Sequence, residues 1–261
     1  YEGSIPFTCS SSKEALKAMV KPSGFFHCFR LRPDLSAGRG GAPVNSGGTR
    51  IFLGVEGVLY AGFLALDLSG RGRGWSVALK YTSILLCFAF VWIRARNRDG
   101  VLVGTALGGT LAADLFLLVL DRCYLAGVTA FCVVQVLYGA RILRLRNWRG
   151  WQWSLACRTG LVMAAWRLLA LLGALEPLTA VAAVYISQLA ANAAESLHLG
   201  RRCFTLGLLL FLCCDLCVGL HNLPSFLPGV GAGGRFAFAA VVMWLFYLPS
   251  RVLITLSAGK E

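Results

Sequence analysis

The sequence predicts an all-α protein, a polytopic membrane bundle of about eight transmembrane helices. Hydrophobic residues make up 57% of the 261 positions and charged residues only 14%. The mean hydropathy of +0.68 is higher than that of a soluble domain with a wetted surface. Apolar runs long enough to cross a hydrocarbon core of about 30 Å recur from residue 51 to the C-terminus. Together these observations exclude an ordinary soluble domain.

The first fifty residues differ in composition from the rest of the chain. Residues 1–50 form an arm that is polar, basic and rich in Gly and Ser, without the hydrophobic core of a signal peptide. We expect this arm to be disordered or to reflect a misplaced gene start, because the chain begins at Tyr1.

Eight apolar segments between residues 51 and 258 form the predicted transmembrane domain. Their approximate bounds are 51–68, 76–94, 101–121, 124–142, 155–173, 178–197, 203–222 and 236–257. The joints are short, and the one at Asp121–Cys123 predicts a tight antiparallel hairpin between the third and fourth helices.

Basic residues orient this domain, because cytoplasmic loops carry most of the positive charge of a membrane protein. One side holds Lys13, Lys17, Lys21, Arg30, Arg32, Arg39, Arg50, Arg94, Arg96, Arg98, Arg141, Arg144, Arg146, Arg149, Arg201 and Arg202. The other side holds only Arg71, Arg73, Lys80, Arg122 and Arg235. Both termini are therefore predicted to be cytoplasmic. This topology explains the net charge of +13 better than nucleic acid does, and we expect no nucleic-acid partner.

The ten cysteines suggest neither a disulfide framework nor a metal site. Most of them lie inside apolar runs, where cysteine acts as a small buried apolar residue. Cys214 and Cys217 form a CxxC, but no second pair and no histidine stand at ligand spacing. We therefore expect no metal and no cofactor.

Two aspartates inside apolar runs, Asp114 and Asp215, are the candidate catalytic residues. An ionisable group at bilayer depth is costly when it faces lipid, so such groups usually turn inward and mark a functional site. Counted along the predicted helices, Asp114 lies about 20 Å and Asp215 about 18 Å from the cytoplasmic end. The two acids are therefore predicted to lie at one depth.

Helical spacing places further polar residues toward the same interior, as candidates for binding the substrate. The sixth helix carries a polar stripe at i, i+3, i+7 and i+10 that consists of Tyr185, Gln188, Asn192 and Glu195. The fourth helix adds Gln135 and Tyr138, and the eighth adds Trp244, Tyr247 and Arg251. On another face of the third helix, close packing against a neighbour is predicted for the small residues Gly104, Gly108 and Ala112.

Each of these polar residues also has a purely structural interpretation. Tyr185, Gln188 and Asn192 can serve as hydrogen-bond links between helices. Arg158 and Arg167 can extend toward the interface or neutralise a buried acid. For Asp114 and Asp215 the structural alternative is a static buried ion pair.

Three segments carry a resemblance to a known family: GVTAFCVVQVLYGAR in the fourth helix, LGLLLFLCCDLCVGLHN in the seventh and MWLFYLPSRVLITLS in the last. With the acid late in the third helix, this pattern over residues 80–257 resembles the YhhN family, the lysoplasmalogenases of eight transmembrane helices, and most closely a divergent bacterial branch. The chain departs from the family where Gln135 replaces a common His, Arg251 replaces a Gln, and the His221–Asn222 region replaces an Arg.

The resemblance implies a hydrolase that cleaves the vinyl ether bond of a lysoplasmalogen into a fatty aldehyde and a glycerophospho head group. It also implies that Asp114 and Asp215 are catalytic, that the partners are a lysophospholipid substrate and membrane lipid, and that the protein resides in a bacterial cell membrane. Hydrolysis of a vinyl ether needs a proton donor for the alkene carbon and a second group for water, and two buried carboxyl groups can divide these roles. We expect Asp215 to donate the proton and Asp114 to hold the water.

The remaining roles follow from the same chemistry. Tyr138, Tyr185 or Tyr247 is expected to orient the substrate, and Arg122, Arg235 or Arg251 to meet its phosphate. Two other functions stay open: a small proton-coupled transporter, since paired acids also suit proton relays, and a non-catalytic scaffold of the same fold.

Overall fold

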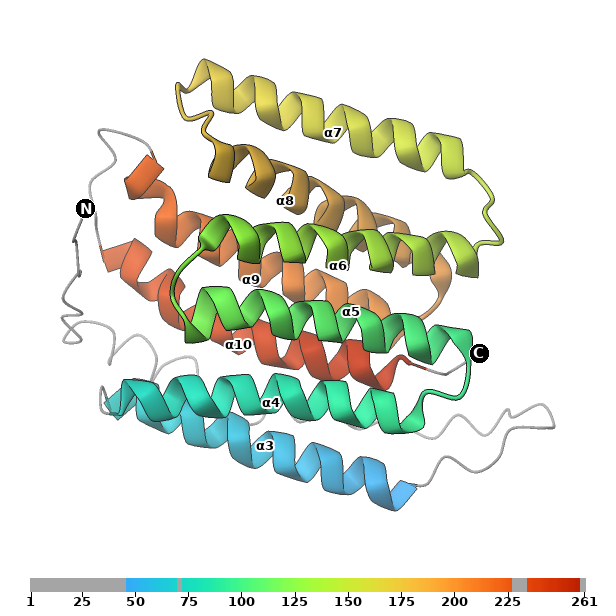
Figure 1. Cartoon of the computed structure of the whole chain (residues 1–261), viewed down its shortest axis with the longest axis vertical. Helices are drawn as coiled ribbons and strands as arrows, with labels where there is room; N and C mark the ends of the chain where they lie inside the picture. Colours follow the sequence, from blue (N-terminus) through green and yellow to red (C-terminus); the bar gives the residue numbers. More distant parts are fainter. Residues whose placement is uncertain (1–45, 70–71, 227–233, 259–261) are drawn as a thin grey trace. The chain divides into compact units, whose positions relative to one another are not determined.

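The structure, a computed structural model, describes residues 46–69, 72–226 and 234–258, and over these residues every element is a helix (Figure 1). The elements are α3 (Ser46–Ser69), α4 (Arg73–Arg94), α5 (Arg98–Asp114), the π-helical segment η1 (Leu115–Val119), α6 (Tyr124–Leu145), α7 (Trp151–Leu171), α8 (Pro177–Ser196), the 3₁₀ turn η2 (Leu197–Leu199), α9 (Arg202–Phe226) and α10 (Gly234–Leu256). The predicted all-α membrane fold is confirmed.

Each predicted span corresponds to one of these helices. Seven helices of the described chain are long and apolar enough to cross a membrane, and α10 adds a shorter apolar stretch, Val242–Leu256. The predicted arm lies outside the described residues except at 46–50, which already belong to α3. Arg71 and the side chains of Arg73 and Arg235 also lie outside the described part.

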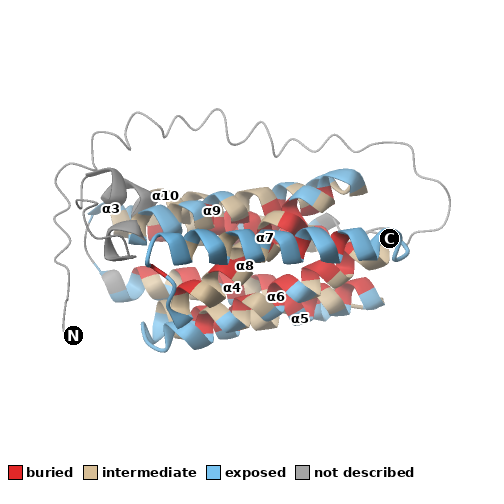
Figure 2. Ribbon diagram, turned by 90° about the horizontal axis from the view of Figure 1, so that it is seen from above, coloured by how far each residue is buried: buried red, intermediate tan, exposed pale blue. Residues whose placement is uncertain are grey.

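The described chain divides inside α3 into a unit that ends at Val55 and a unit of Glu56–Glu261, and the second unit contains the candidate site. Within it α10 packs on α9 and α4, α5 lies between α4 and α6, and α8 contacts α6, α7 and α9. Figure 2 shows that the buried residues lie along the facing sides of these helices, whereas α7 is largely exposed.

The α5–α6 hairpin has the tight geometry that its sequence predicts. Only residues 120–123 separate η1 from α6, and Asp121 and Cys123 adopt positive φ values of 49° and 54°. At Gly127, in the first turn of α6, an added Cβ would lie 2.5 Å from Cγ of Leu117. Glycine is therefore required where α6 passes η1.

The predicted small-residue face of α5 is confirmed at two of its three positions. An added Cβ at Gly104 would lie 2.9 Å from the ring of Trp92, and one at Gly108 would lie 3.3 Å from the ring of Phe88. The missing side chains let these α4 rings lie on the backbone of α5. Ala112 is exposed, so the prediction is wrong there, because the helix turns this position away from α4.

Arg141 and Lys80, which the charge analysis counted toward the two sides of the membrane, are buried inside helices and paired with acids. Arg141 on α6 is buried, and its guanidinium forms two 2.7 Å hydrogen bonds with the carboxylate of Asp99. Lys80 on α4 is also buried, and its Nζ lies 2.8 Å from Asp67 Oδ2. Each pairs with an acid because an unpaired charge is costly in an apolar interior.

Pro249 interrupts the hydrogen bonding of α10 close to the candidate site. Because proline has no backbone N–H, the carbonyl of Leu245 one turn earlier loses its helical partner, and the hydroxyl of Tyr60 points to that carbonyl at 3.5 Å. One turn later α9 approaches α10 so closely that a Cβ at Gly207 would lie 3.1 Å from the carbonyl oxygen of Ser250. These contacts hold the turn of α10 that carries Tyr247 and Arg251.

Candidate active site

Asp114 is the last α-helical residue of α5, at the point where the helix widens into η1. The amide of Leu120 donates to the carbonyl of Leu115 over 2.8 Å, an i to i−5 bond typical of a π-helix. Such π segments often occur at functional sites. The Asp114 side chain is buried, and its Oδ2 accepts a 2.5 Å hydrogen bond from the hydroxyl of Tyr247 on α10.

Asp215 lies in the middle of α9 and has a matching tyrosine partner. The hydroxyl of Tyr185 on α8 donates a hydrogen bond to Asp215 Oδ2. The ring of Tyr185 is buried against Phe131 and Phe211, with ring centroids 5.5 Å and 6.2 Å away. This packing fixes the hydroxyl that holds the carboxylate.

The two aspartates come within electrostatic range of each other and share one cation. Asp215 interacts electrostatically with Asp114, and both interact with the guanidinium of Arg251 on α10. The structure thus brings together residues from α5, α8, α9 and α10, of which Asp114, Asp215, Tyr185, Tyr247 and Arg251 were all predicted as site residues.

Arg251 is the least satisfied group in this cluster. Its side chain has no exposed surface, and its Cζ lies 3.6 Å from the ring centroid of Phe211 and 4.4 Å from that of Tyr247. Cation–π contacts of this kind favour the charge. Within the described part of the chain, however, neither Nε nor either terminal nitrogen meets the geometry of a hydrogen bond.

Two further buried donors on α6 share this condition. The hydroxyl of Tyr138 interacts electrostatically with Arg251, yet it has no hydrogen-bond partner of good geometry among the described residues, and neither has Nε2 of Gln135. Gln135 and Tyr138 are separated by one helical turn and lie on one face of α6. Buried donors normally have partners, and unpaired ones indicate a water, an ion or a ligand. This site therefore offers donors to an acceptor-rich group.

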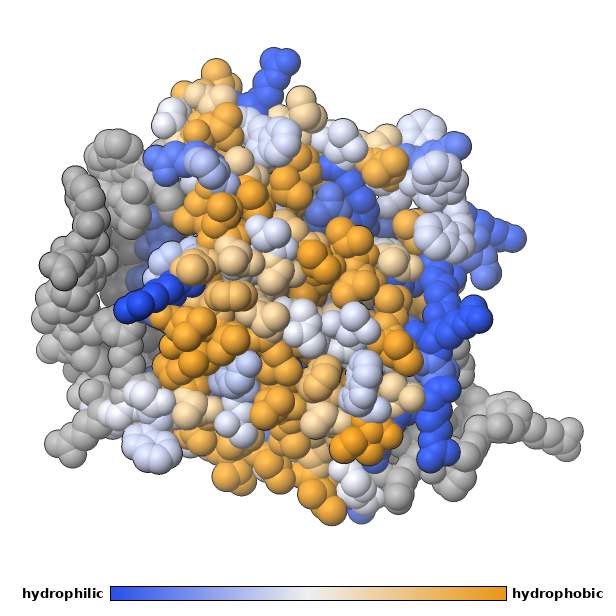
Figure 3. Space-filling model, viewed as in Figure 1, coloured by the Kyte–Doolittle hydropathy of each residue, from blue (hydrophilic) through white to orange (hydrophobic). Residues whose placement is uncertain are grey.

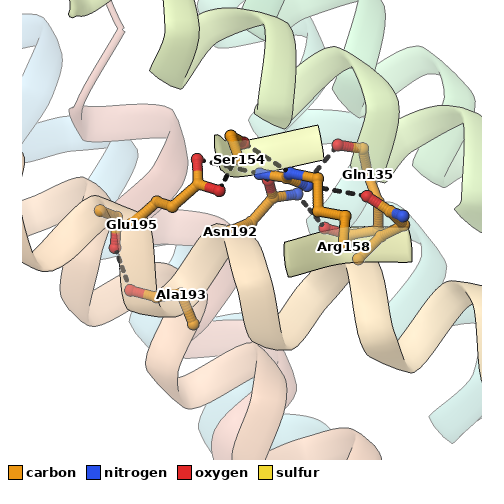
Figure 4. Close-up of polar contacts among 8 residues, drawn as sticks. Gln135, Ser154, Arg158, Asn192, Ala193 and Glu195 are labelled. Carbon is orange, nitrogen blue, oxygen red and sulfur yellow. Dashed lines mark hydrogen bonds and ion pairs between the residues drawn. The ribbon is translucent and has the colours of Figure 1, made fainter. Parts of the chain in front are cut away.

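A second polar cluster, centred on Arg158 of α7, lies across α6 and α8 (Figure 4). Arg158 donates to Gln188 Oε1 and to Asn192 Oδ1, each over 2.8 Å, and forms an ion pair of 3.1 Å with Glu195. Its Nε donates to Ser154, whose hydroxyl donates to Glu195 over 2.6 Å. This network attaches α7 to the bundle.

The predicted polar stripe of α8 therefore divides between two places. Tyr185 meets Asp215, whereas Gln188 and Asn192 bind Arg158 and correspond to the structural alternative of hydrogen-bond links between helices. Gln135 belongs to the Arg158 network, because its Oε1 and its main-chain oxygen each accept a 2.9 Å hydrogen bond from Asn192 Nδ2, whereas its Nε2 stays unpaired in the described chain.

Sequence reasoning left two polar residues without a place in the site. It left open whether Arg158 extends toward the interface or neutralises an acid, and the structure shows an ion pair with the partly buried Glu195. It also did not select Glu56, which is buried and accepts hydrogen bonds from Ser83 and from Cys87, the latter over 3.4 Å.

The cysteines of the described chain form neither a disulfide nor a metal-binding group. Over the described residues no three His, Cys, Asp or Glu side chains gather as a metal-binding group. The eight described cysteines are free thiols, and Cys213 is exposed, which is contrary to its predicted burial.

The comparisons with known proteins identify a family. Residues 75–258, more than two-thirds of the chain, match the family model of the YhhN family. Neither the comparison with curated proteins nor that with solved structures gave a match.

Proposed function

Because the chain belongs to the YhhN family, we propose that it is a lysoplasmalogenase-like hydrolase that cleaves the vinyl ether bond of a lysoplasmalogen. One observation supports this most strongly: two intramembrane aspartates, each held by a tyrosine hydroxyl, lie around a buried guanidinium that makes no hydrogen bond of good geometry in the described chain. A membrane-embedded site of this kind suits a substrate that resides in the bilayer.

The two carboxyl groups divide the chemistry. Asp215 donates its proton to the alkene carbon, which leaves an oxocarbenium ion at the carbon that bears the ether oxygen. Water held by Asp114 adds to that carbon and gives its proton to Asp114. The hemiacetal hydroxyl then loses its proton as the bond to the glycerol oxygen breaks, and the glycerol oxygen takes up a proton. The products are a fatty aldehyde and a glycerophospho head group, and the proton on Asp114 returns to Asp215 to restore the pair. The net reaction consumes one water molecule.

The tyrosines prepare the carboxyl groups for these steps. Tyr185 and Tyr247 each engage the Oδ2 atom of their aspartate, which leaves Oδ1 for the substrate carbon or for water. Their rings pack against Phe211, with centroids 6.2 Å and 6.0 Å away. Rigid aromatic packing keeps both acids in position before the substrate arrives, which lowers the cost of orienting it.

The unpaired donors provide a place for the phosphate of the substrate. Arg251 can give the paired hydrogen bonds that phosphate oxygens accept, and the Tyr138 hydroxyl and Gln135 Nε2 extend the donor set along α6. We expect phosphate bound there to bring the vinyl ether toward Asp114, because Arg251 Cζ lies 4.4 Å from the ring centroid of Tyr247, whose hydroxyl binds Asp114.

The proposed orientation, with both termini in the cytoplasm, rests on the arginines of the α4–α5, α6–α7 and α8–α9 joints.

The test is aldehyde release from ethanolamine and choline lysoplasmalogens by purified, detergent-solubilised protein. Asp114→Asn and Asp215→Asn should each abolish turnover in protein that elutes and melts like the parent. Asp121→Asn is the matched control, because this exposed aspartate bonds only Tyr124 among the contacts described and should leave turnover unchanged. A parent protein inactive toward both lipids would overturn the proposal and favour a transporter or a scaffold.

A further inference from the structure

A groove far from the aspartates lies between the beginning of α5 and the end of α6. It has a volume of about 560 Å³. Three arginines and a tryptophan surround its mouth: Arg96, Arg98, Arg144 and Trp148. Figure 3 shows hydrophilic side chains gathered at this end of the face, beside the apolar surface of the helices.

The inner part of the groove has the opposite character. Val101 and Thr105 line it from α5, one and two turns beyond Arg98, and Leu137 and Ala140 line it from α6. Since seven residues of helix rise about 10 Å, Thr105 lies about 10 Å deeper along the bundle than Arg98. The groove is therefore basic at the helix ends and apolar toward the middle of the bundle.

No acidic side chain lines the groove in the described chain. Asp99, the nearest acid in sequence, is buried and bonded to Arg141 through both of its oxygens. Asn97 is also engaged, because its side chain accepts a 2.8 Å hydrogen bond from the amide of Gly100 as the N-cap of α5. Arg96 and Arg98 therefore face no acid among the residues that line the groove.

From this arrangement we propose that the groove binds an anionic phospholipid. The phosphate and its negative head group lie beside Arg96 and Arg98, and an acyl chain follows Val101 and Leu137 toward the bilayer interior. Basic pockets between transmembrane helices recognise anionic head groups in this way. Trp148, of which 57% is exposed, is suited to the level of the glycerol, where tryptophan is enriched.

This lipid site is independent of the proposed hydrolase site. Its residues come from the α4–α5 joint, the first turns of α5, the last turns of α6 and the turn after α6, and none of them belongs to the cluster around Asp114 and Asp215. The lipid held there is a structural or regulatory ligand that is not cleaved. Its binding can therefore be measured without an activity assay.

The experiment titrates detergent-solubilised protein with phosphatidylglycerol or phosphatidylcholine and follows the bound lipid by native mass spectrometry. The parent should bind phosphatidylglycerol at least about fivefold more tightly, since each arginine near a membrane surface contributes about 1 kcal/mol toward an anionic lipid. Arg96→Gln/Arg98→Gln should remove most of this preference. The matched pair Arg201→Gln/Arg202→Gln, at the start of α9 and outside the groove, should retain it.

A steric variant separates a site from general attraction to a basic surface. Ala140→Phe fills the groove without changing its charge, and Val101→Trp does so from the α5 wall if the first variant fails to fold. Either folded variant should weaken phosphatidylglycerol binding about fivefold or more. Unchanged binding in the filled variant would overturn the proposal, and so would an equal loss in the Arg201/Arg202 control pair.

Discussion

Arg141 and Arg251 are both fully buried in one bundle, yet their surroundings are opposite. Arg141 is bound on every side: Asp99 accepts two hydrogen bonds of 2.7 Å, and the hydroxyl and carbonyl of Ser257 accept two of 2.8 Å. Arg251 has aromatic rings and two nearby acids, but none of its nitrogens makes a hydrogen bond of good geometry in the described chain. The guanidinium of Arg141 therefore has protein acceptors for its donors, whereas that of Arg251 has donors that a ligand could use.

The physical cost of the two arrangements explains why both can exist. A buried charge is tolerated when hydrogen bonds satisfy it. The hydrogen bonds of Arg141 link α6 to Asp99 on α5 and to Ser257 directly after α10. Donors left unpaired in an apolar interior cost about 1–3 kcal/mol each. Unpaired donors beside two carboxylates lower the stability of the ligand-free protein, and a bound ligand can accept their hydrogen bonds. Such local destabilisation is typical of functional sites.

The largest effect that separates the two arginines should be on stability. Arg141→Met leaves Asp99 buried without its donors, and removing one partner of a buried pair costs about 3–5 kcal/mol. Unfolding in SDS, followed by circular dichroism, measures this loss. The double variant Arg141→Met/Asp99→Leu should recover most of it, because no uncompensated charge remains. Equal stability of the single variant and the parent would refute the structural role of this pair.

Replacing Arg251 should instead affect turnover. Arg251→Met loses no hydrogen bond of good geometry in the described chain, and both acids keep their tyrosine partners, so its free energy of unfolding should fall less than that of Arg141→Met. Loss of the phosphate partner should lower kcat/KM for lysoplasmalogen by about 2–4 kcal/mol, or about thirtyfold to a thousandfold. Aldehyde release and SDS unfolding, measured on the same preparation of the variant, separate a loss of turnover from a loss of stability. A stability loss as large as that of Arg141→Met would show that Arg251 is structural.

The tyrosines should give smaller effects of the same kind. Tyr185→Phe and Tyr247→Phe each remove one hydrogen bond to a carboxylate and keep the ring packing on Phe211. A hydrogen bond to a charged group contributes about 1.5–3 kcal/mol, so kcat should fall about tenfold to a hundredfold. Tyr60→Phe is the control, since its hydroxyl meets the Leu245 carbonyl and neither acid. Turnover equal to the parent in both site variants would remove the tyrosines from the mechanism.

The contrast also shows what the sequence could predict. Each helix follows from hydropathy, and Asp114, Asp215 and Arg251 stand out because a charged residue in an apolar run is rare. The partner of each charge did not follow, because helical spacing specifies a face and leaves open which helix lies against it. Arg141 appeared to be a loop charge and Gln188 a substrate ligand, and only the packing of α5, α7 and α8 assigns them to Asp99 and Arg158.

The network at Arg158 should show the smallest effect, and it provides an internal comparison between two glycines. A Cβ at Gly139 on α6 would lie 3.2 Å from Asn192 Oδ1 and 3.4 Å from Arg158 Nη1, whereas one at Gly160 on α7 would meet nothing within 4 Å. Gly139→Ala should therefore displace the polar side chains and destabilise the protein by about 1 kcal/mol. Gly160→Ala should stabilise it by up to about 1 kcal/mol, since alanine favours a helix more than glycine does. If SDS unfolding ranks the two substitutions in the reverse order, α7 is not attached to the bundle through Arg158. If Gly139→Ala lowers kcat/KM far more than stability, this network also positions a group that the substrate contacts, with the Nε2 of Gln135, unpaired in the described chain, as the candidate.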